Sequence, residues 1–374
     1  MQQQNVQKQK FRKQARMKKK SRIIAINGES WCRTVTGIER VAIETTKELD
    51  RLAESGKIEL VVPKNAQNLP ELKNIKIVRL EAEASFFPKW TQVHFQKYVI
   101  KNRRLSLDFS NTCPFFSPGI EYIHDIFAKL YPSDYSANPR DRLIQLYSNL
   151  MYRRIARKAK KIITVSEYSK KTIADTYKIN PDRIKVVYAG MGNYSAIKPD
   201  YSVFRLFPEL EEKKFYFSLG SLSTRKNLKW IIEHASLYPD EQFVVSGKSL
   251  ESIVPEELKK TGNLKNIIMA GYLSDGQVKA MLSKCRAFIF PSYFEGFGIP
   301  PLEALSCGAK IIISDAASLP EIYGKCACYI SPDKPDVNLD EVLSQPVESP
   351  EKLLEKFTLH NSAVRLYDVL KEYF

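Results

Sequence analysis

The sequence lacks long hydrophobic runs and has few cysteines. Its longest apolar runs, such as IIAI and FIFPSYF, are far shorter than the ~20 residues that a membrane-spanning helix requires. The N-terminus is basic, but the apolar segment of a signal peptide does not follow it. Only six cysteines are scattered through the 374 residues. Without a secretory signal, this pattern predicts reduced thiols in a cytoplasmic protein.

Metal-binding and nucleic-acid-binding motifs are also missing from the sequence. Cys326 and Cys328 form the one close cysteine pair, and no second Cys or His cluster accompanies them, so we assign this pair no metal. The net charge is +16, yet the sequence shows no helix-turn-helix, zinc-finger or RNA-recognition signature. We therefore expect no nucleic-acid partner.

The positive charge gathers in two segments. Residues 1–22 contain nine basic side chains and no acidic one, and "RRIARKAKK" over 153–161 is the second cluster. A polybasic segment gains roughly 1 kcal/mol per Lys or Arg near an acidic leaflet. We therefore expect contact with an anionic membrane surface through 1–22 and 153–161. A disordered tail over 1–21 that only aids solubility is an equally open interpretation.

Short apolar runs alternate with helical patterns from residue 22 onward. Runs at 23–26, 58–62, 75–80, 120–123, 162–165 and 184–187 predict strands, followed in the second half by FYFSL, QFVVS, NIIMA, AFIF and AKIIIS. Helices are expected near 227–237, 275–284 and 301–307. Such alternation is typical of parallel sheets covered on both faces. We predict an α/β fold of two Rossmann-like parallel-sheet domains that face a cleft.

The expected domains follow from the same pattern. They are an N-terminal domain over 22–192, a linker over 193–212 and a C-terminal domain over 213–357. One predicted helix, RLIQLYSNLMYRRIARKA, has apolar residues at helical spacing. These are Leu143, Leu146, Tyr147, Leu150, Met151 and Ile155.

The segment PSYFEGFGIPPLEALSCG (291–308) places two carboxylates beside a predicted buried strand. Its glycines allow the backbone to approach a ligand, and its adjacent prolines are suited to a helix start. We expect Glu303 in the first turn of that helix and Glu295 on the loop before it. A diphosphate could bind the free N–H groups of this turn, and the carboxylates would then accept hydrogen bonds from hydroxyls on either side. Taken alone, Glu303 is equally typical of an ordinary helix start.

Within this segment, EGFGIPPLE resembles the E-x7-E signature of the retaining glycosyltransferases of family 4, which have the GT-B fold of two Rossmann-like domains. The next residues, ALSCGAKIIISDAASLPEIYG, resemble the continuation of the same family pattern. The resemblance implies that Glu303 holds the ribose of a nucleotide-sugar and that Glu295 contacts the donor sugar. It also places the backbone of Phe297 and Gly298 near the sugar and the diphosphate.

A second segment, FSLGSLSTRKNLKWII, resembles the opening strand and loop of the family's donor domain. Lys226 matches the lysine that binds the donor diphosphate there. The family often has an arginine directly after the strand's glycine, whereas this sequence has Ser221. Whether Arg225 replaces that arginine stays open at this point. A cation here suits a departing nucleoside diphosphate, which develops negative charge.

Two segments of the N-terminal half carry the rest of the resemblance. YIHDIFAKLYP resembles the family's HD segment, which implies that His124 assists at the reacting centre, with Asp125 beside it. VTGIERVAIETTKEL resembles the glycine loop and first helix of the acceptor domain, which implies loop or acceptor contacts for Gly37 and Arg40. We group Asp125 with them as a loop or acceptor residue. Family habit also implies that the helix over 358–374 crosses back onto the N-terminal domain.

Together these segments predict a retaining hexosyltransferase of cell-surface polysaccharide synthesis, with His124 and Glu295 as catalytic residues. The donor would be a UDP-, GDP- or dTDP-linked sugar, and the acceptor a hydroxyl of a glycan or lipid-linked glycan at the inner face of the membrane. No Asp-x-Asp metal motif is present, so we expect no cofactor and no metal requirement. Two alternatives stay open: an inactive glycosyltransferase-like binding subunit and a GT-B nucleotide-sugar epimerase.

Overall fold

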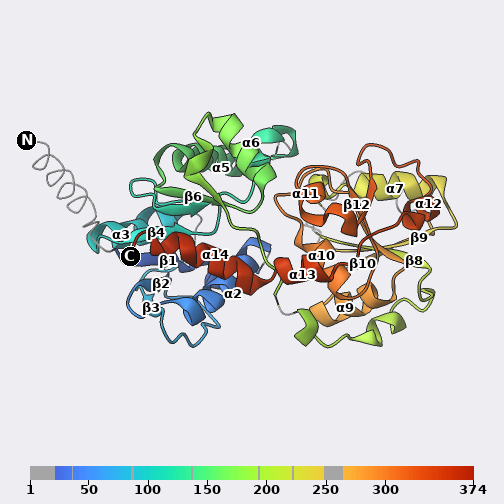
Figure 1. The fold of residues 1–374 in the computed structure, drawn as a ribbon, viewed down its shortest axis with the longest axis horizontal. Helices are drawn as coiled ribbons and strands as arrows, with labels where there is room; N and C mark the ends of the chain where they lie inside the picture. The colour runs from blue at the N-terminus through green and yellow to red at the C-terminus, as the bar shows by residue number, and fades with distance from the viewer. Residues whose placement is uncertain are drawn as a thin grey trace, which may run out of the picture. The chain divides into compact units, whose positions relative to one another are not determined.

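The computed structural model describes residues 22–35, 37–85, 88–135, 138–192, 194–220, 223–247 and 264–374 (Figure 1). The basic tail over 1–21, and with it nearly all of the expected membrane segment 1–22, lies outside the described residues, as does Ser221. None of the described helices is both long enough and apolar enough to cross a membrane.

The described strands form two sheets. The first has the order β3-β2-β1-β4-β5-β6-β7, and the second has the order β10-β9-β8-β11-β12-β13. Their bounds are β1 Ile24–Asn27, β2 Ile58–Val62, β3 Lys76–Arg79, β4 Leu105–Asp108, β5 Ile120–Tyr122, β6 Lys161–Thr164, β7 Ile184–Val186, β8 Phe215–Leu219, β9 Gln242–Ser246, β10 Ile267–Gly271, β11 Ala287–Phe290, β12 Ile311–Ser314 and β13 Cys328–Ile330.

The strand orders of the two sheets share one rule. The first strand of each lies inside the sheet, with β1 between β2 and β4 and β8 between β9 and β11, and these pairs are parallel. Doubly wound sheets of this kind bind ligands beyond the carboxyl ends of their strands, where the strand order reverses. In the second sheet that place is beyond β8 and β11, so the loops over 220–227 and 291–298 are the candidates for a site.

Helices connect the strands of both sheets. The α-helices are α2 Gly37–Leu52, α3 Gln96–Lys101, α4 Phe127–Leu130, α5 Pro139–Lys158, α6 Glu167–Tyr177, α7 Leu228–Leu237, α9 Asp275–Lys284, α10 Ile299–Ser306, α11 Leu319–Tyr323, α12 Leu339–Ser344, α13 Glu351–Lys356 and α14 Leu359–Lys371. A π-helix, η2, spans Trp90–Phe95. The 3-10 helices are η1 Gly28–Cys32, η3 Pro132–Tyr135, η4 Pro181–Arg183, η5 Tyr194–Ala196, η6 Tyr201–Arg205, η7 Thr224–Lys226 and η8 Gly324–Cys326.

The chain divides into two compact units, neither of which is continuous in sequence. The first consists of the described residues up to Ile123 together with Ser148–Ile163 and Ser362–Phe374. The second consists of His124–Tyr147 and Thr164–Asn361. Most of α14 is therefore part of the first unit, where the Tyr367 hydroxyl accepts a hydrogen bond from the Glu54 N–H at 3.2 Å. The expected domains over 22–192 and 213–357 were continuous, whereas these units are interleaved.

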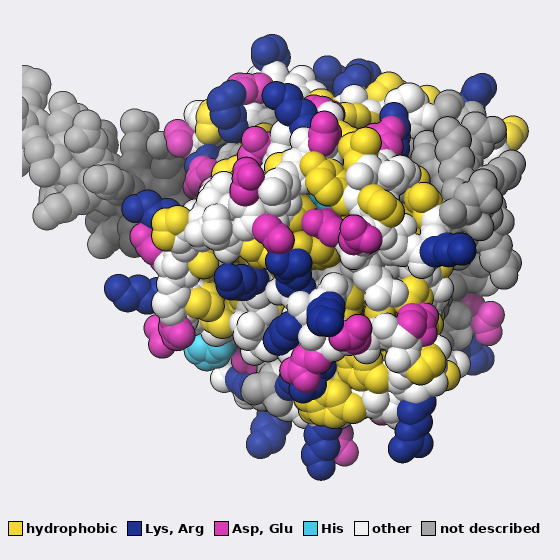
Figure 2. Space-filling model, turned by 90° about the vertical axis from the view of Figure 1, so that its right-hand side faces the viewer, with side chains coloured by type: hydrophobic (Ala, Val, Ile, Leu, Met, Phe, Trp, Pro, Cys, Tyr) yellow, Lys and Arg dark blue, Asp and Glu magenta, His cyan; other side chains and the backbone are white. Residues whose placement is uncertain are grey.

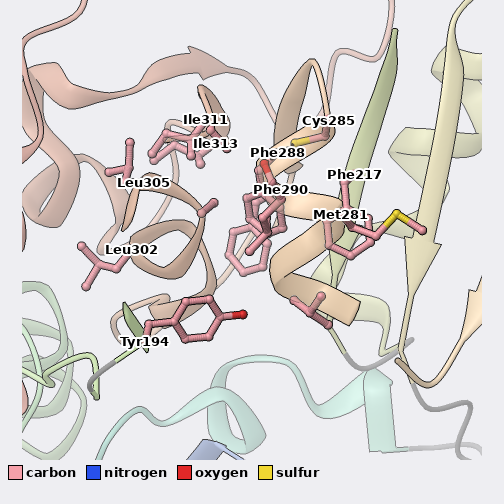
Figure 3. Close-up of a cluster of buried hydrophobic side chains, with 14 of the residues drawn as sticks. Tyr194, Phe217, Met281, Cys285, Phe288, Phe290, Leu302, Leu305, Ile311 and Ile313 are labelled. Carbon is pink, nitrogen blue, oxygen red and sulfur yellow. Dashed lines mark hydrogen bonds between the residues drawn. The ribbon is translucent and has the colours of Figure 1, made fainter. Parts of the chain in front are cut away.

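The second sheet is covered by apolar side chains on both faces. Phe215 and Phe217 of β8 belong to one buried cluster, and Tyr216 between them belongs to another. Figure 3 shows the first cluster, in which Phe217, Phe288 and Phe290 of the strands meet Leu302 and Leu305 of α10. Burial on both faces explains why these strands read as continuous apolar runs. The predicted α/β fold with two parallel-sheet, Rossmann-like arrangements is confirmed.

Two strands were not predicted, for an identifiable reason. β4 reads LSLD, which alternates apolar and polar residues and gives no apolar run. It is nevertheless buried, because the Ser106 hydroxyl donates a hydrogen bond to the Glu121 carboxylate of β5 at 2.6 Å. β13 reads CYI and contains a single β-branched residue, so it gives no β-branched run of the kind that located other strands.

The structure confirms the helix predicted over 142–159 and shows that only part of its apolar side is covered. In α5, Met151 and Ile155 are buried as expected. Leu143, Leu146 and Leu150, which share the same periodicity, are largely exposed. Helical spacing identifies an apolar side of a helix, but it does not say whether the protein covers that side along its whole length.

Candidate active site

The loop from Pro291 to Gly298 joins β11 to α10, and three side chains fix its backbone. The Ser318 hydroxyl donates to the Glu295 carbonyl at 2.9 Å, and the Ser166 hydroxyl donates to the Gly296 carbonyl at 2.7 Å. The Tyr323 hydroxyl donates to the Gly298 carbonyl. These donors come from buried parts of the second unit, so side chains of the protein itself position the loop.

Both glycines of this loop are required by geometry. A Cβ at Gly296 would lie 2.7 Å from the carbonyl oxygen of His124, too close for any other residue. Gly298 has φ 84° and caps the start of α10, a conformation that residues with a Cβ rarely adopt. Gly296 therefore allows the loop to pack against the backbone of His124.

Lys226 and Glu295 form a buried ion pair at the candidate site. The Nζ of Lys226 lies 2.7 Å from Oε1 of Glu295, although the residues are 69 positions apart in the chain. The two come together because Lys226 follows β8 and Glu295 follows β11, which are neighbours in the sheet. The ammonium also lies 4.6 Å from the centre of the Phe290 ring. The sequence assigned these residues separate ligand groups, and the structure adds that they contact each other.

Burial and charge act against each other on the pKa of Glu295. Burial alone would raise the pKa of this carboxyl, but the nearby Lys226 and Arg225 outweigh it and hold the pKa below its ordinary value. For Lys226, burial lowers the pKa of the ammonium, and the attraction of Glu295 opposes this only in part. The pair therefore presents a carboxylate that accepts hydrogen bonds beside a cation with little solvent around it.

Arg225 pairs with Asp125 rather than standing alone. Its Nη1 lies 3.5 Å from Oδ2 of Asp125, and its guanidinium carbon lies 5.6 Å from the centre of the Phe127 ring. The other carboxylate oxygen of Asp125 accepts the Phe127 N–H at 2.9 Å, which fixes the carboxylate. The sequence grouped Asp125 with the acceptor loop, and the structure places it within the second unit as the partner of Arg225.

Asn227 connects the two loops of the site, and sequence reasoning missed it. Its side-chain amide donates to the carbonyls of Pro291 at 3.0 Å and Pro332 at 2.8 Å. Its backbone is left-handed, with φ 57°, between η7 and α7. Asparagine tolerates this conformation better than most residues, so the position of Asn227 directly after Lys226 was a readable signal for a sharp turn.

His124 is buried directly after β5, next to the loop glycine. Its backbone carbonyl faces Gly296. The second unit therefore brings together His124, Asp125, Arg225, Lys226 and Glu295, along with the backbone of Phe297 and Gly298. Gly37 and Arg40 begin α2 in the first unit, where both are exposed.

The expected place of Glu303 needs one correction. α10 starts at Ile299, so the two prolines are its second and third residues and Glu303 is its fifth. Glu303 is half-buried in the second turn, and the first turn contains no acidic residue. The helix starts earlier because Gly298 already acts as its cap. Its end is as predicted: Gly308 has φ 75°, and the Ala309 N–H bonds the Ala304 carbonyl at 3.1 Å.

A cluster of aromatic rings lies beside the loop, and the sequence analysis did not predict it. Phe294 contacts Phe127, Tyr131 and Tyr168, with ring centres 5.5 to 6.1 Å apart. The Tyr293 hydroxyl lies 3.4 Å from the Asp134 carboxylate, and burial together with that carboxylate raises the pKa of Tyr293. These rings restrict water around the ion pairs and so strengthen their electrostatic effect.

The first sheet has a buried polar network at its own point of strand reversal. The Asn27 amide, which ends β1, donates to Asp108 of β4 at 2.6 Å and to Thr91 at 2.9 Å. Glu29 pairs with Arg33 at 2.8 Å in the loop that follows β1. Burial raises the pKa of Asp108 to about 6 despite these hydrogen bonds. The network fixes the segment from Asn27 to Arg33. This segment precedes α2, whose first residue is Gly37.

The described part of the chain contains no group of three or more His, Cys, Asp or Glu side chains that could hold a metal ion. Oxygen, nitrogen and sulfur ligands gathered from several side chains are what metals require in proteins. The cations available at the candidate site are instead those of Arg225 and Lys226.

Two family models match the chain in succession. One is described as Glycosyltransferase Family 4 and matches residues 35–191. The other is described as Glycosyl transferases group 1 and matches residues 204–354. The second match contains Arg225, Lys226, Glu295 and Glu303, and the first contains His124 and Asp125.

Curated relatives are similar at low identity. The O-antigen chain mannosyltransferase RfbU of Salmonella typhimurium is 23% identical over 270 residues, which cover 71% of this chain and 70% of the relative. The serotype-specific mannosyltransferase WbdA of Escherichia coli is 27% identical over 270 residues, which cover 67% of this chain but only 31% of that protein. The chain therefore spans less than a third of WbdA.

Solved structures of similar fold cover nearly the whole chain. Sucrose-phosphate synthase from Thermosynechococcus elongatus has a TM-score of 0.70 at 15% identity, covering 94% of this chain and 98% of its own. The Anabaena protein HepE, solved with UDP and glucose, has a TM-score of 0.68 at 15% identity. The match covers 94% of this chain and 100% of the HepE chain. These likenesses show the fold. The two family models together match residues 35–191 and 204–354, so the chain belongs to the glycosyltransferases of family 4, which have the GT-B fold.

Proposed function

We propose that this glycosyltransferase moves a hexosyl group from a nucleotide-sugar to a hydroxyl of a glycan acceptor and retains the anomeric configuration. The observation that carries the proposal is the buried pair of Lys226 and Glu295 at the carboxyl ends of β8 and β11. A cation and a carboxylate 2.7 Å apart suit a ligand that presents phosphates on one side and hydroxyls on the other.

Each residue of the site has a proposed role. Lys226 and Arg225 neutralise the diphosphate, which becomes more negative as it leaves. Glu295 accepts hydrogen bonds from the transferred sugar, and Glu303 accepts them from the ribose. The backbone of Phe297 and Gly298 contacts the sugar and the diphosphate. His124 lies beside Gly296 and assists at the reacting centre.

The pairing of Glu295 argues against a covalent intermediate on its carboxylate. Retaining glycosidases place two carboxyl groups roughly 5 Å apart across the bond that breaks, and one of them attacks the sugar. Glu295 is instead held by Lys226. We propose that the acceptor oxygen bonds to the anomeric carbon on the face that the diphosphate leaves. The acceptor proton then passes to the departing phosphate oxygen.

For the acceptor, we propose a glycan or lipid-linked glycan of cell-surface polysaccharide synthesis, used at the inner face of the membrane. RfbU, named an O-antigen chain mannosyltransferase, and WbdA, named a serotype-specific mannosyltransferase, support this acceptor class. HepE, solved with UDP and glucose, supports a nucleotide-linked donor. Gly37 and Arg40, at the start of α2, are the proposed acceptor contacts. UDP-, GDP- and dTDP-linked sugars are the donors to test.

The test is a thermal-unfolding screen with a panel of nucleotide-sugars, followed by transfer assays with the best donor. A donor at about 100 times its Kd stabilises the folded protein by about 2.7 kcal/mol. We expect one nucleotide series to raise the Tm clearly and its sugar to be transferred. Stabilisation without transfer would favour the inactive binding subunit, and conversion of the free nucleotide-sugar would favour the epimerase. No stabilisation by any member would contradict the proposal.

We also propose that transfer needs no metal ion. Lys226 and Arg225 supply the positive charge that a divalent cation would otherwise bring to the diphosphate. Transfer in excess EDTA is therefore expected at the rate measured with added magnesium. A strict magnesium requirement, restored by adding the ion back, would show that these two cations are not sufficient.

A further inference from the structure

Helix α5 (Pro139–Lys158) carries an exposed apolar stripe that continues into arginines. Leu143, Leu146 and Leu150 are 66%, 64% and 50% exposed. Arg153 and Arg157 follow at the same spacing of three and four residues and are also exposed, so all five lie along one side of the helix. We call the three leucines the leucine stripe. Other residues of α5 are buried: Met151, Tyr152, Ile155 and Ala156.

The ends of the leucine stripe are positively charged. Arg140 and Arg142 precede it and are exposed, and Arg153 and Arg157 follow it. Over its whole length α5 contains six Arg or Lys residues and one acidic residue, Asp141. Asp141 accepts a hydrogen bond from the Asn138 amide at 2.7 Å at the start of the helix. The stripe is therefore an apolar surface bordered by cations at both ends.

A second exposed apolar side chain lies close to the basic end of α5. Nε of Arg154 donates to the Phe115 carbonyl at 2.6 Å, and its guanidinium lies 4.5 Å from the centre of the Phe115 ring. This contact holds the loop at 115–116 against α5. Phe116, in the same loop, is 74% exposed, more than any other large apolar side chain among the described residues.

We propose that α5 docks the protein on an anionic membrane surface. The leucine stripe enters the boundary between headgroups and acyl chains, and the flanking arginines bind lipid phosphates. Apolar residues bordered by Lys and Arg are the pattern of helices that lie in the membrane interface, and Arg side chains can bury their stems while the charge stays at the headgroups. The sequence analysis expected the cluster at 153–161 to contact lipid, and the structure adds the apolar part of that contact.

The size and charge of the surface favour a membrane over a protein partner. Leu143 and Leu150 are seven residues apart, so the stripe is about 10 Å long. A stable protein interface buries about 800 Å² on each partner. Three leucine side chains along so short a stripe offer far less area than that. On the face of the molecule drawn in Figure 2, Lys and Arg side chains alternate with Asp and Glu. Along α5, by contrast, six basic residues accompany one acidic residue, an excess of positive charge suited to an anionic surface.

The experiment is sedimentation of the full chain with phosphatidylcholine vesicles, with and without phosphatidylglycerol. The test variant changes the leucine stripe to glutamine (Leu143→Gln, Leu146→Gln, Leu150→Gln). The matched control makes the same change at two leucines outside α5, Leu206→Gln and Leu237→Gln, which are 64% and 54% exposed. We expect binding only with phosphatidylglycerol, a loss of about tenfold or more in the test variant and no change in the control. Glutamine is a good helix former, and unchanged thermal unfolding verifies that the variant folds.

Two further variants complete the test. Arg153→Gln with Arg157→Gln is expected to weaken binding to anionic vesicles about tenfold at low salt, with a smaller loss at high salt because salt screens these charges. Deletion of residues 1–20 must leave binding sensitive to the leucine change. Binding that depends on the tail alone would overturn the proposal, as would a leucine variant that binds vesicles normally. A leucine change that converts a dimer to a monomer without weakening vesicle binding would also overturn it, because the stripe would then be a contact between two copies of the chain. Vesicle binding needs no sugar donor, so either result leaves the proposed reaction untouched.

Discussion

Replacing Lys226 with methionine is expected to lower kcat/KM for sugar transfer about a thousandfold. The Lys226 ammonium lies 2.7 Å from the Glu295 carboxylate and, in the proposed reaction, neutralises the leaving diphosphate. Loss of one such electrostatic contact in a desolvated site costs about 2.7–4 kcal/mol of transition-state stabilisation. Methionine keeps the apolar stem over the Phe290 ring, so the change removes mainly the charge.

The same variant is also expected to unfold at lower temperature, because it leaves Glu295 buried without its partner. Removing one member of a buried ion pair costs about 3–5 kcal/mol of folding free energy. Burial raises the pKa of this carboxyl, and in the native protein Lys226 opposes that effect. Adding Glu295→Gln removes the unpaired charge, so the double variant should recover most of the lost stability and none of the transfer.

This difference between stability and activity separates a catalytic role from a structural one. Lys229→Met is the matched control, since Lys229 is an exposed lysine on α7, three residues further along, 3.6 Å from Glu233. It is expected to change transfer and Tm little. A double variant that transfers sugar at the native rate would show that the pair serves only the fold. A single variant with native kcat/KM would remove Lys226 from the site.

The fold was largely predictable, and its misses have physical reasons. Strands of the second sheet appear in the sequence as apolar runs because both of their faces are buried. β4 was missed because it buries the polar side chains of Ser106 and Asp108, which a search for apolar runs cannot recognise. The exposure of the leucine stripe of α5 had no sequence signal, because periodicity reports one side of a helix but not what covers it.

The sequence predicted which residues belong to the candidate site, but it did not predict which of them contact each other. The E-x7-E segment located Glu295 and Glu303, and the RKN segment located Lys226. The contact of Lys226 with Glu295 depends on β8 and β11 being neighbours, which a linear pattern does not state. The pairing of Arg225 with Asp125 joins residues far apart in the chain and has no sequence signal. The turn that holds Glu303 was misjudged because Gly298, at φ 84°, already caps the helix.

The contact of Arg225 also bears on whether this residue replaces the family arginine, since the sequence has Ser221 at the family's arginine position. Arg225 pairs with Asp125 and lies close enough to Glu295 to lower the pKa of that carboxyl. It therefore belongs to the same charged group as Lys226. This position supports its proposed role as the second cation for the diphosphate, in place of the family arginine that is absent at 221. The missing arginine favours the inactive-subunit alternative, and a second cation supplied by Arg225 weakens that argument.

Replacing Glu303 with alanine is expected to lower kcat/KM at least a hundredfold while the Tm stays close to that of the native protein. Glu303 is half-buried in the second turn of α10, so its removal opens no core cavity. Hydrogen bonds to a charged group contribute about 1.5–3 kcal/mol each, and the two hydroxyls of a ribose can supply two of them. Glu233→Ala, on the exposed side of α7, is the control for loss of a surface carboxylate.

Donors that lack a ribose hydroxyl make this prediction specific to the proposed contact. With a UDP- or GDP-linked donor, native protein should use the 2′-deoxy or 3′-deoxy form at least about tenfold less well than the ribose form. In the Glu303→Ala variant that preference should disappear, because the carboxylate that accepts the hydroxyl's hydrogen bond is gone. Removing the hydroxyl from the donor then causes no further loss of activity. Equal discrimination by both proteins would place the ribose against another residue. Loss of the preference in the Glu303 variant, with retention of it when Glu295 is changed to glutamine, would assign the ribose to Glu303 and leave the transferred sugar to Glu295.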